Sequence, residues 1–304
     1  MPDTSERTWE LLRLAADRGL TLRPETAVLD DTGWDFQVLR AATGAGREWI
    51  LRVPRRAEVA TAARAEQRLL ALLRGRFAVA IPDWSIADSE LIAYPRLAGE
   101  PAASEDITSY ELVWRIDRVD PPAAYVDRLG AFMAELHATP VDAAAATGIP
   151  VRDADGVRGR FAVQIDRGGQ EFGMHPSWRD RASRWLQRDD LWADRTVLIH
   201  GDLHPGHTLV DPAGALTGVL DWTDAEVGDP GQEFVEAARK FPPVVLDRLV
   251  AAYGRHDGPA WPGLRGHVTE AIAFAPLALG ILGLEAGKQR YVDRAREYFG
   301  TPTV

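Results

Sequence analysis

The sequence predicts an α+β protein of two lobes, a strand-bearing N-terminal lobe over residues 1–97 and a mostly helical lobe over residues 98–304. Three observations carry this prediction. Alternating apolar patterns dominate before residue 95, and helical periodicity dominates after it. A stretch rich in Pro and Gly separates the two patterns. Two short strands that carry acidic residues interrupt the second half, at residues 197–221.

The N-terminal lobe is predicted to combine two helices with two strand pairs. Apolar residues at helical spacing indicate helices over residues 5–18 and 58–74. Alternation on both sides of a Gly-containing turn at residues 43–46 indicates a β-hairpin over residues 36–53. A second strand pair is expected over residues 85–94.

The stretch from Tyr94 to Pro101 is the expected linker between the lobes, with a hinge at about residues 94–99. Beyond it, residues 141–176 are rich in Ala, Gly and Asp and give little signal. The remaining pattern is helical and predicts segments over residues 125–137, 178–192, 233–239, 244–253 and 268–287.

Composition excludes several classes of protein. The formal net charge is −10, which argues against a nucleic-acid partner because phosphate backbones require a basic surface. The chain has no cysteine, so disulfides and thiolate metal sites are excluded. No apolar leader opens the chain, and no later stretch was expected to span a membrane. We therefore expect a cytoplasmic protein without a membrane partner, acting as a monomer.

The chemistry is expected between Val197 and Pro230, where two buried strands each deliver an acid. The apolar run 197–199 is followed by His200, Asp202, His204 and His207, and the run 216–220 ends in Asp221. This arrangement holds two carboxylates at one place on a rigid support.

The spacing resembles the catalytic core of kinase-type phosphotransferases. In those enzymes an H-x-D loop supplies the catalytic Asp, a metal ligand follows five residues later, and a strand brings a second Asp to Mg²⁺. The strings HGDLHPGH and LDWTDAEVGDP, with R-x-P-R at residues 52–55, look most similar to macrolide 2′-phosphotransferases. The resemblance implies a two-lobe protein-kinase-like fold.

The resemblance also implies roles for three residues. Asp202 would orient the acceptor hydroxyl, and His207 and Asp221 would bind Mg²⁺. Each of the three also has a structural interpretation. Asp202 could form a turn, and Asp221 could cap the end of a strand. His207 could be a loop histidine that is hydrogen-bonded to the backbone. His200 is expected to brace the loop.

A nucleotide, GTP or ATP, would lie between the lobes. Arg52 occupies the strand position at which kinases place a phosphate-binding Lys, and Glu66 would be its partner, although Glu66 could equally face solvent. Gly33 would lie in the phosphate-covering loop, where backbone groups of residues 32–34 could contact phosphate. The expected purine-binding hinge comprises Tyr94, Arg96 and Leu97.

The implied acceptor is a macrolide, which combines a large apolar ring with a cationic aminosugar. It requires an apolar groove with acids near Asp202. The expected acceptor-binding residues are His204, Asp224, Glu270, Phe274, Leu277 and Ile281, the last three on one face of the apolar helix 268–287.

The resemblance therefore implies transfer of a γ-phosphate to the 2′-hydroxyl of a macrolide aminosugar, which inactivates the antibiotic. Two other enzyme activities stay open at this point. One is phosphorylation of an aminoglycoside or another small-molecule hydroxyl on the same fold. The other is metal-dependent hydrolysis at a zinc cluster of His200, Asp202, His204 and His207.

Overall fold

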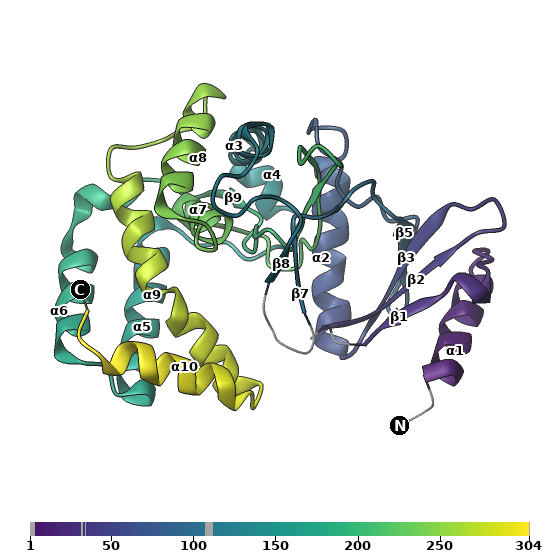
Figure 1. Ribbon diagram of the computed structural model, residues 1–304, viewed down its shortest axis with the longest axis horizontal. Coiled ribbons are helices and arrows are strands. Elements are labelled where there is room, and N and C mark those ends of the chain that lie inside the picture. The colour runs from purple at the N-terminus through teal and green to yellow at the C-terminus, as the bar shows by residue number, and fades with distance from the viewer. Residues whose placement is uncertain (1–3, 32, 34, 107–111, 304) are drawn as a thin grey trace.

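The computed structural model describes residues 4–31, 33, 35–106 and 112–303. Within these residues an N-terminal sheet is followed by a helical C-terminal part, so the expected α+β class is confirmed. Figure 1 shows the sheet with α1 at one end of the molecule, and α5, α6, α9 and α10 at the other.

The N-terminal sheet has five antiparallel strands in the order β1-β2-β3-β5-β4. Their bounds are β1 Val28–Asp30, β2 Phe36–Ala42, β3 Glu48–Pro54, β4 Ile86–Ala87 and β5 Ile92–Pro95. The predicted hairpin is confirmed, since β2 pairs with β3 from Phe36 opposite Pro54 to Ala42 opposite Glu48. A 3-10 helix, Pro24–Thr26, precedes β1.

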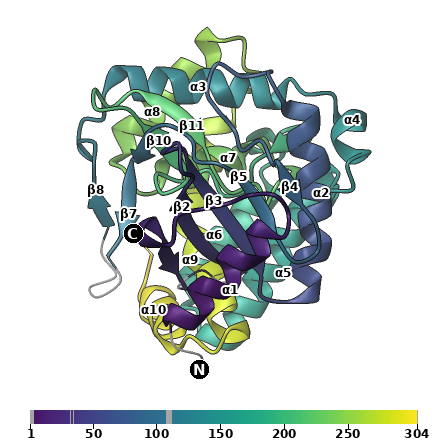
Figure 2. The same cartoon turned by 90° about the vertical axis from the view of Figure 1, so that its right-hand side faces the viewer.

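One helix packs on each face of this sheet (Figure 2). Alternating strand residues such as Leu39 and Leu51 pack with apolar residues of α1 (Thr4–Ala16). The intervening ones, such as Phe36 and Ile92, pack with α2 (Ala57–Leu73). Successive strand residues therefore point alternately toward α1 and toward α2.

Short strand pairs follow the linker and support the segments that carry His200 and Asp221. β5 ends at Pro95, and the chain next pairs in the other lobe, where β6 lies against β10. The change of sheet thus falls within the stretch expected to be the linker, although the lobe boundary itself stays a prediction. The short strands are β6 Glu100–Pro101, β7 Ala103–Glu105, β8 Leu112–Trp114, β9 Val197–Ile199, β10 Thr208–Val210, β11 Leu216–Val219 and β12 Glu226–Gly228.

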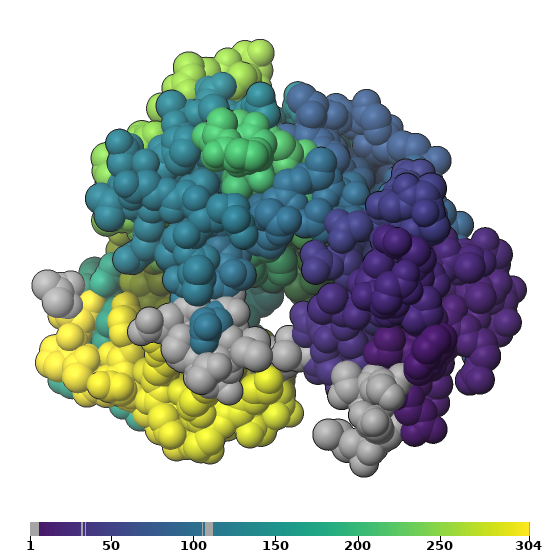
Figure 3. Space-filling model, turned by 45° about the vertical axis from the view of Figure 1, so that its right-hand side comes forward, coloured from purple at the N-terminus to yellow at the C-terminus, as the bar shows by residue number. Residues whose placement is uncertain are grey.

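The C-terminal lobe is built around one large apolar core to which its helices contribute. The helices are α3 Ala123–His137, α4 Val141–Ala145, α5 Ala154–Phe172, α6 Pro176–Gln187, α7 Pro230–Ala238, α8 Pro243–Arg255, α9 Leu264–Glu285 and α10 Gln289–Gly300, with a 3-10 helix at Asp189–Leu191. Figure 3 shows a hollow between the purple N-terminal lobe and the yellow C-terminal helix.

Two long helices were missed by the sequence reasoning. α5 lies in the Gly-rich stretch that gave little signal, where Asp153 caps its first turn and Gly173 ends it in the left-handed conformation. α10 follows the last predicted helix. The tertiary contacts of α5 and α10 with α9 stabilise these helices despite their weak local signals.

α9 also differs from the expectation that no stretch of the chain could span a membrane. It has 22 residues, and an 18-residue stretch within it has a mean hydropathy of 1.6, so by length and composition it could span a membrane. Core helices pass the same test, and α9 contains Pro276 and packs against α5, α7 and α10. Its apolar character is accounted for by these helix contacts.

The packing of α3 on α8 gives a first testable prediction. A Cβ added at Gly130 would lie 2.7 Å from both the Ala252 Cβ and the Tyr253 backbone nitrogen. We expect Gly130→Ala to cost about 1–3 kcal/mol by overpacking. Gly159→Ala in α5 is the control, because an added Cβ there meets nothing within 4 Å and should stabilise the helix by up to about 1 kcal/mol. Thermal unfolding midpoints of the two variants should move in opposite directions, and equal shifts would contradict this packing.

Candidate active site

The catalytic loop begins where the buried strand β9 ends. Gly201 has φ +86°, and a Cβ there would lie 2.2 Å from the Asp224 carbonyl oxygen. Only glycine allows the two loops to approach this closely. The approach brings the segment after β9 beside the segment after β11, so the two predicted acid-bearing strand ends do meet.

His200 connects the two strand ends through hydrogen bonds. Its Nε2–H donates to the carbonyl oxygen of Leu220 at 2.8 Å, and its Nδ1 accepts from the Asp202 backbone N–H at 3.3 Å. Burial lowers the pKa of His200, and both bonds use the neutral ring. The His200 backbone N–H donates to Oε2 of the fully buried Glu233 at 2.6 Å. His200 thus braces the loop, as expected, and offers no free nitrogen to a metal.

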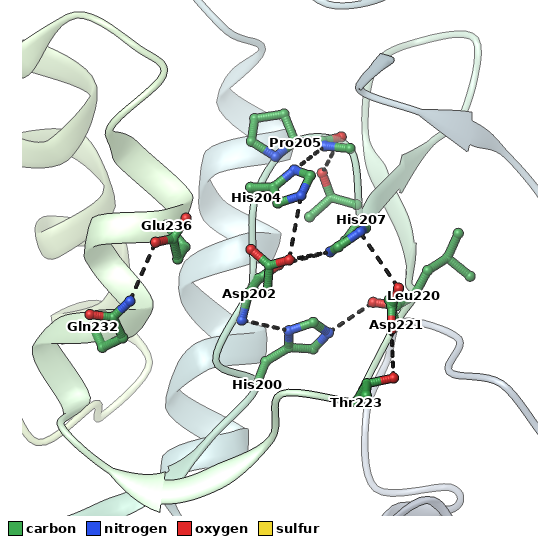
Figure 4. A network of polar contacts seen from close by, with 12 residues as sticks. His200, Asp202, His204, Pro205, His207, Leu220, Asp221, Thr223, Gln232 and Glu236 are labelled. Atoms are coloured by element: carbon green, nitrogen blue, oxygen red, sulfur yellow. Dashed lines mark hydrogen bonds and ion pairs between the residues drawn. The ribbon is translucent and has the colours of Figure 1, made fainter. Parts of the chain in front are cut away.

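His207 lies between Asp202 and Asp221 (Figure 4). Its Nδ1 lies 2.9 Å from the Asp202 carbonyl oxygen, which can only accept, so Nδ1 carries a proton. In the neutral ring this leaves the lone pair on Nε2, which is 3.9 Å from Oδ2 of Asp221. The sequence-predicted pair of metal ligands is therefore brought together with compatible chemistry.

His204 has the opposite tautomer. Its Nδ1 accepts from the Gly206 N–H at 2.9 Å, which leaves the proton on Nε2, 3.7 Å from Oδ2 of Asp202. Burial and neighbouring His207 lower the pKa of His204 to about 3, so the ring is neutral.

This tautomer bears on the zinc alternative. Asp202, His204 and His207 do present ligand-type atoms within 4.8 Å of one another. A metal on Nε2 of His204 would, however, break the bond from Gly206, and both nitrogens of His200 are already bonded. The geometry therefore disfavours a zinc cluster and leaves His204 as a donor beside Asp202.

Asp221 is held from the N-terminal lobe. The guanidinium of Arg52 donates to Oε1 of Glu66 at 2.9 Å and lies 3.4 Å from Oδ1 of Asp221. Thr223 completes this network from the loop after Asp221. Burial opposes the charge of Asp221, but Arg52, His207 and the Thr223 hydroxyl lower its pKa to about 2. Asp221 is thus a carboxylate at neutral pH.

Arg52 itself is almost fully buried, and the Phe36 ring lies 3.9 Å from its Cζ. Burial opposes its charge, while Glu66 and Asp221 outweigh that effect and raise its pKa. Glu66, for which a solvent-facing position was equally open, is buried and paired with Arg52.

The other sequence-predicted nucleotide residues lie along the edge between the lobes. The carbonyl oxygen of Gly33 accepts from Arg55, and residues 32 and 34 lie outside the described residues. The Tyr94 side chain is buried with α2, so only its backbone could face a purine. Arg96 is tied by its backbone to Glu48, and the Leu97 side chain lies beside Gly218. Their purine-binding role stays a prediction.

A cavity of about 400 Å³ opens beside the catalytic loop, and three acids line it, Asp224, Glu236 and Glu226. Glu226 is paired with Arg152 and Arg160. Desolvation in the cleft and the charges of Asp202 and Asp221 raise the pKa of Asp224 to about 6. Burial raises the pKa of Glu236 on α7 and Asp202 adds to the effect, while Arg239, paired with Glu236 at 2.6 Å, opposes it. The lining also includes Arg152, Arg160, Phe161, Gln164, Gln232, Ala271, Phe274, Ala275 and Ala278.

A second cavity of about 450 Å³ lies on the other side of the loop, beside His204. Its lining is aromatic and aliphatic with some basic groups, and includes Leu112, Pro276, Leu279, Tyr291, Tyr298, Arg239, Lys240 and Arg294.

The face of the apolar helix 268–287 that was expected to bind the acceptor does not line these two cavities, except at Phe274. Leu277 and Ile281 pack into the core and are not on a ligand surface; Leu277 contacts Gly168 of α5. Phe274 is buried as well, stacked on Trp185, although it reaches the edge of the first cavity. A spacing of three and four identifies one face of a helix, but not which side the core covers.

Glu270 also lies away from the position expected for it. It is paired with Arg181 at 2.7 Å and lines a separate cavity with residues of α6. The structure therefore does not bring Glu270 to the catalytic loop.

Glu233, Glu236 and Thr223 were missed by the sequence reasoning. Glu233 and Glu236 are three residues apart on α7, directly after the Asp229 cap that accepts from the Gly231 N–H. That spacing directs both acids to one side of the helix and is the signal that could have identified them. Thr223 offered no comparable signal.

Comparison with known proteins defines the class of enzyme. The sequence model of the phosphotransferase enzyme family matches residues 26–267. A protein of Bacillus subtilis (strain 168), YcbJ, described as uncharacterized, is 37% identical over 96% of this chain and 95% of its own length. Viomycin phosphotransferase of Streptomyces vinaceus is 31% identical over 28% of this chain and 31% of its own length.

Two solved structures are similar over nearly the whole chain. Macrolide 2′-phosphotransferase MphH from Brachybacterium faecium has a TM-score of 0.88 at 40% identity, covering 98% of this chain and 99% of its own. Macrolide 2′-phosphotransferase type I has a TM-score of 0.86 at 33% identity, covering 98% of both chains. The chain therefore belongs to the phosphotransferase enzyme family. It has the kinase-like fold of that family and is a phosphotransferase that acts on a hydroxyl group.

The Arg52 network generates the second prediction. Lysine has one ammonium and cannot contact Glu66, Asp221 and Thr223 through a planar fork. We expect Arg52→Lys to lose at least one charge-assisted hydrogen bond, about 1.5–3 kcal/mol, and to raise the nucleotide KM at least about tenfold. The acceptor KM, measured at saturating nucleotide, should change little. An unchanged nucleotide KM would show that nucleotide binding does not need the guanidinium fork of Arg52.

Proposed function

We propose that the protein transfers the γ-phosphate of GTP or ATP to the 2′-hydroxyl of a macrolide aminosugar and so confers antibiotic resistance. The two full-length structural relatives named above support the acceptor class. The main observation behind the proposal is that two acids, Asp224 and Glu236, line the cavity beside the catalytic loop. The charge of Asp202 contributes to raising the pKa of both.

The acids match the reacting end of the acceptor. A macrolide aminosugar carries its dimethylammonium next to the hydroxyl that is phosphorylated. Asp224 and Glu236 would attract this cation, and the hydroxyl would then donate to the carboxylate of Asp202. Nε2–H of His204, 3.7 Å from Asp202, would help to hold that carboxylate. Phosphoryl transfer relies on such positioning and on neutralising charge, so one carboxylate is sufficient.

The large apolar ring requires another surface. The second cavity meets this need, because Tyr291, Tyr298 and Leu279 line it and it borders the same loop at His204. Each cavity alone, at about 400 and 450 Å³, is small for a whole macrolide. We propose that the aminosugar occupies the first and the ring the second.

The donor side is supported by the charges between the lobes. Nε2 of His207 and the carboxylate of Asp221 fit a divalent metal ion, since one offers a lone pair and the other is ionised at neutral pH. A divalent metal ion held by these two residues would supply positive charge for the phosphates of the nucleotide. Arg52 would add a second positive charge on the N-terminal side. GTP as the preferred donor, monomeric state and cytoplasmic location belong to the proposal.

Nucleotide consumption tests the proposal directly. The purified protein is incubated with Mg²⁺, GTP or ATP, and either erythromycin or kanamycin. We expect erythromycin to stimulate turnover and to gain the mass of one phosphate. Stimulation by kanamycin alone would replace the acceptor assignment by an aminoglycoside. Stimulation by neither drug would remove antibiotics as acceptors.

The role proposed for Asp202 leads to the third prediction. Asp202→Ala should lower turnover by about three orders of magnitude or more, because the acceptor hydroxyl would lose the carboxylate that orients it. The Kd for the macrolide, measured by calorimetry, should change much less. Turnover close to that of the parent enzyme would contradict the assignment.

The raised pKa of Asp224 makes the fourth prediction. Its carboxylate forms only as the pH rises through about 6, so a cationic acceptor should bind better at pH 7 than at pH 5. The macrolide KM should fall over this range, and Asp224→Asn should flatten that part of the profile. A wild-type profile unaffected by Asp224→Asn would show that Asp224 does not meet the cation.

A further inference from the structure

Thr223 joins groups from both lobes through one hydroxyl. Its Oγ1 accepts from the Arg52 guanidinium at 3.2 Å, and its single proton lies between Oδ1 of Asp221 at 2.9 Å and Oε2 of Glu66 at 3.2 Å. Arg52 comes from β3, Glu66 from α2, and Asp221 from the loop after β11. Thr223 also lines the first cavity, so it stands between the nucleotide side and the acceptor side.

This hydroxyl makes the two oxygens of Asp221 different. Oδ1 faces Thr223 and Arg52. Oδ2 faces Nε2 of His207, 3.9 Å away. Figure 4 shows Asp221 between the His207 ring on one side and Thr223 on the other. The carboxylate therefore has one oxygen engaged by the protein and one directed at the neighbouring nitrogen lone pair.

We propose that Thr223 is a positioning residue that fixes the Asp221 carboxylate so that Oδ2 alone, together with Nε2 of His207, is presented to the divalent metal ion. The inference rests on the metal role proposed above for Asp221. Residues that hydrogen-bond to a metal ligand orient it, and their loss weakens metal binding even though they never touch the ion.

Loss of the hydroxyl would affect two groups at once. Oδ1 of Asp221 would keep only the 3.4 Å contact with Arg52, so the carboxylate could rotate and offer either oxygen. Oε2 of the buried Glu66 would lose the hydroxyl that donates to it, which favours movement of Glu66 and of the Arg52 paired with it. Valine has nearly the shape of threonine, so its effect isolates the hydroxyl.

The experiment measures metal binding without turnover. Mn²⁺ is titrated by calorimetry into enzyme saturated with GDP or ADP, whichever binds. We expect Thr223→Val to weaken Mn²⁺ binding about 10-fold or more, and Thr223→Ser, which keeps the hydroxyl, to stay within about twofold of the parent enzyme. Thr223→Ala replaces the valine variant if valine does not fold, with the same loss expected. Circular dichroism and the thermal unfolding midpoint check that each variant is folded.

Two controls separate this inference from the proposals on which it rests. Thr217→Val removes a hydroxyl that donates to the Ala98 carbonyl at 2.9 Å and does not touch Asp221, so Mn²⁺ affinity should be unchanged. Asp221→Asn should greatly weaken Mn²⁺ binding. Parent-like Mn²⁺ affinity in Thr223→Val, or equal losses in valine and serine variants, would overturn the role of Thr223. Parent-like affinity in Asp221→Asn would overturn the metal assignment and this inference with it. No macrolide is present, so failure of the acceptor proposal leaves this test intact.

Discussion

The buried guanidinium of Arg52 connects the two lobes at the place where the nucleotide phosphates are expected. Moving this charge out of water is costly, and among the described residues Glu66 from its own lobe and Asp221 from the other are the acids paired with it. Removing one partner of such a buried pair typically costs about 3–5 kcal/mol. The relative position of the lobes is therefore tied to the orientation of Asp221. The site proposed for phosphate and metal is thus formed by residues of both lobes.

Charge of opposite sign lies on either side of the catalytic loop. Arg52 provides positive charge toward the N-terminal lobe, where an anionic nucleotide is proposed to bind. Asp224 and Glu236 are acids on the side toward α7 and α9, where a cationic acceptor is proposed to bind. His200 holds the two acid-bearing strand ends together between these regions with a neutral ring. In the proposed complex the network would separate two substrates of opposite charge and keep their reacting atoms close to Asp202.

Much of the fold and of the candidate site could be predicted, because the sequence signals for these parts are local. The strand–acid pattern around Asp202 and Asp221, the hairpin and the Arg52 position all depend on short spacings. The predictions that were missed or wrong concern features that depend on tertiary contacts. α5 and α10 are stabilised by α9, and α5 decides which side of α9 faces the core. Glu270 forms an ion pair with Arg181 from α6. Thr223 could not be found from sequence, because two of its three charged partners, Arg52 and Glu66, come from distant segments.

The position of the phosphate on the product decides whether the acids beside Asp202 orient the acceptor. In the proposed complex Asp202 lies next to the acids that would bind the ammonium, so the hydroxyl that reacts would be the neighbour of the amine. After incubation with GTP, Mg²⁺ and erythromycin, two-dimensional ¹H–³¹P correlation locates the new phosphoester. We expect coupling only to the aminosugar proton at C2′. A phosphate on the neutral sugar or on the macrolactone ring would contradict this expectation.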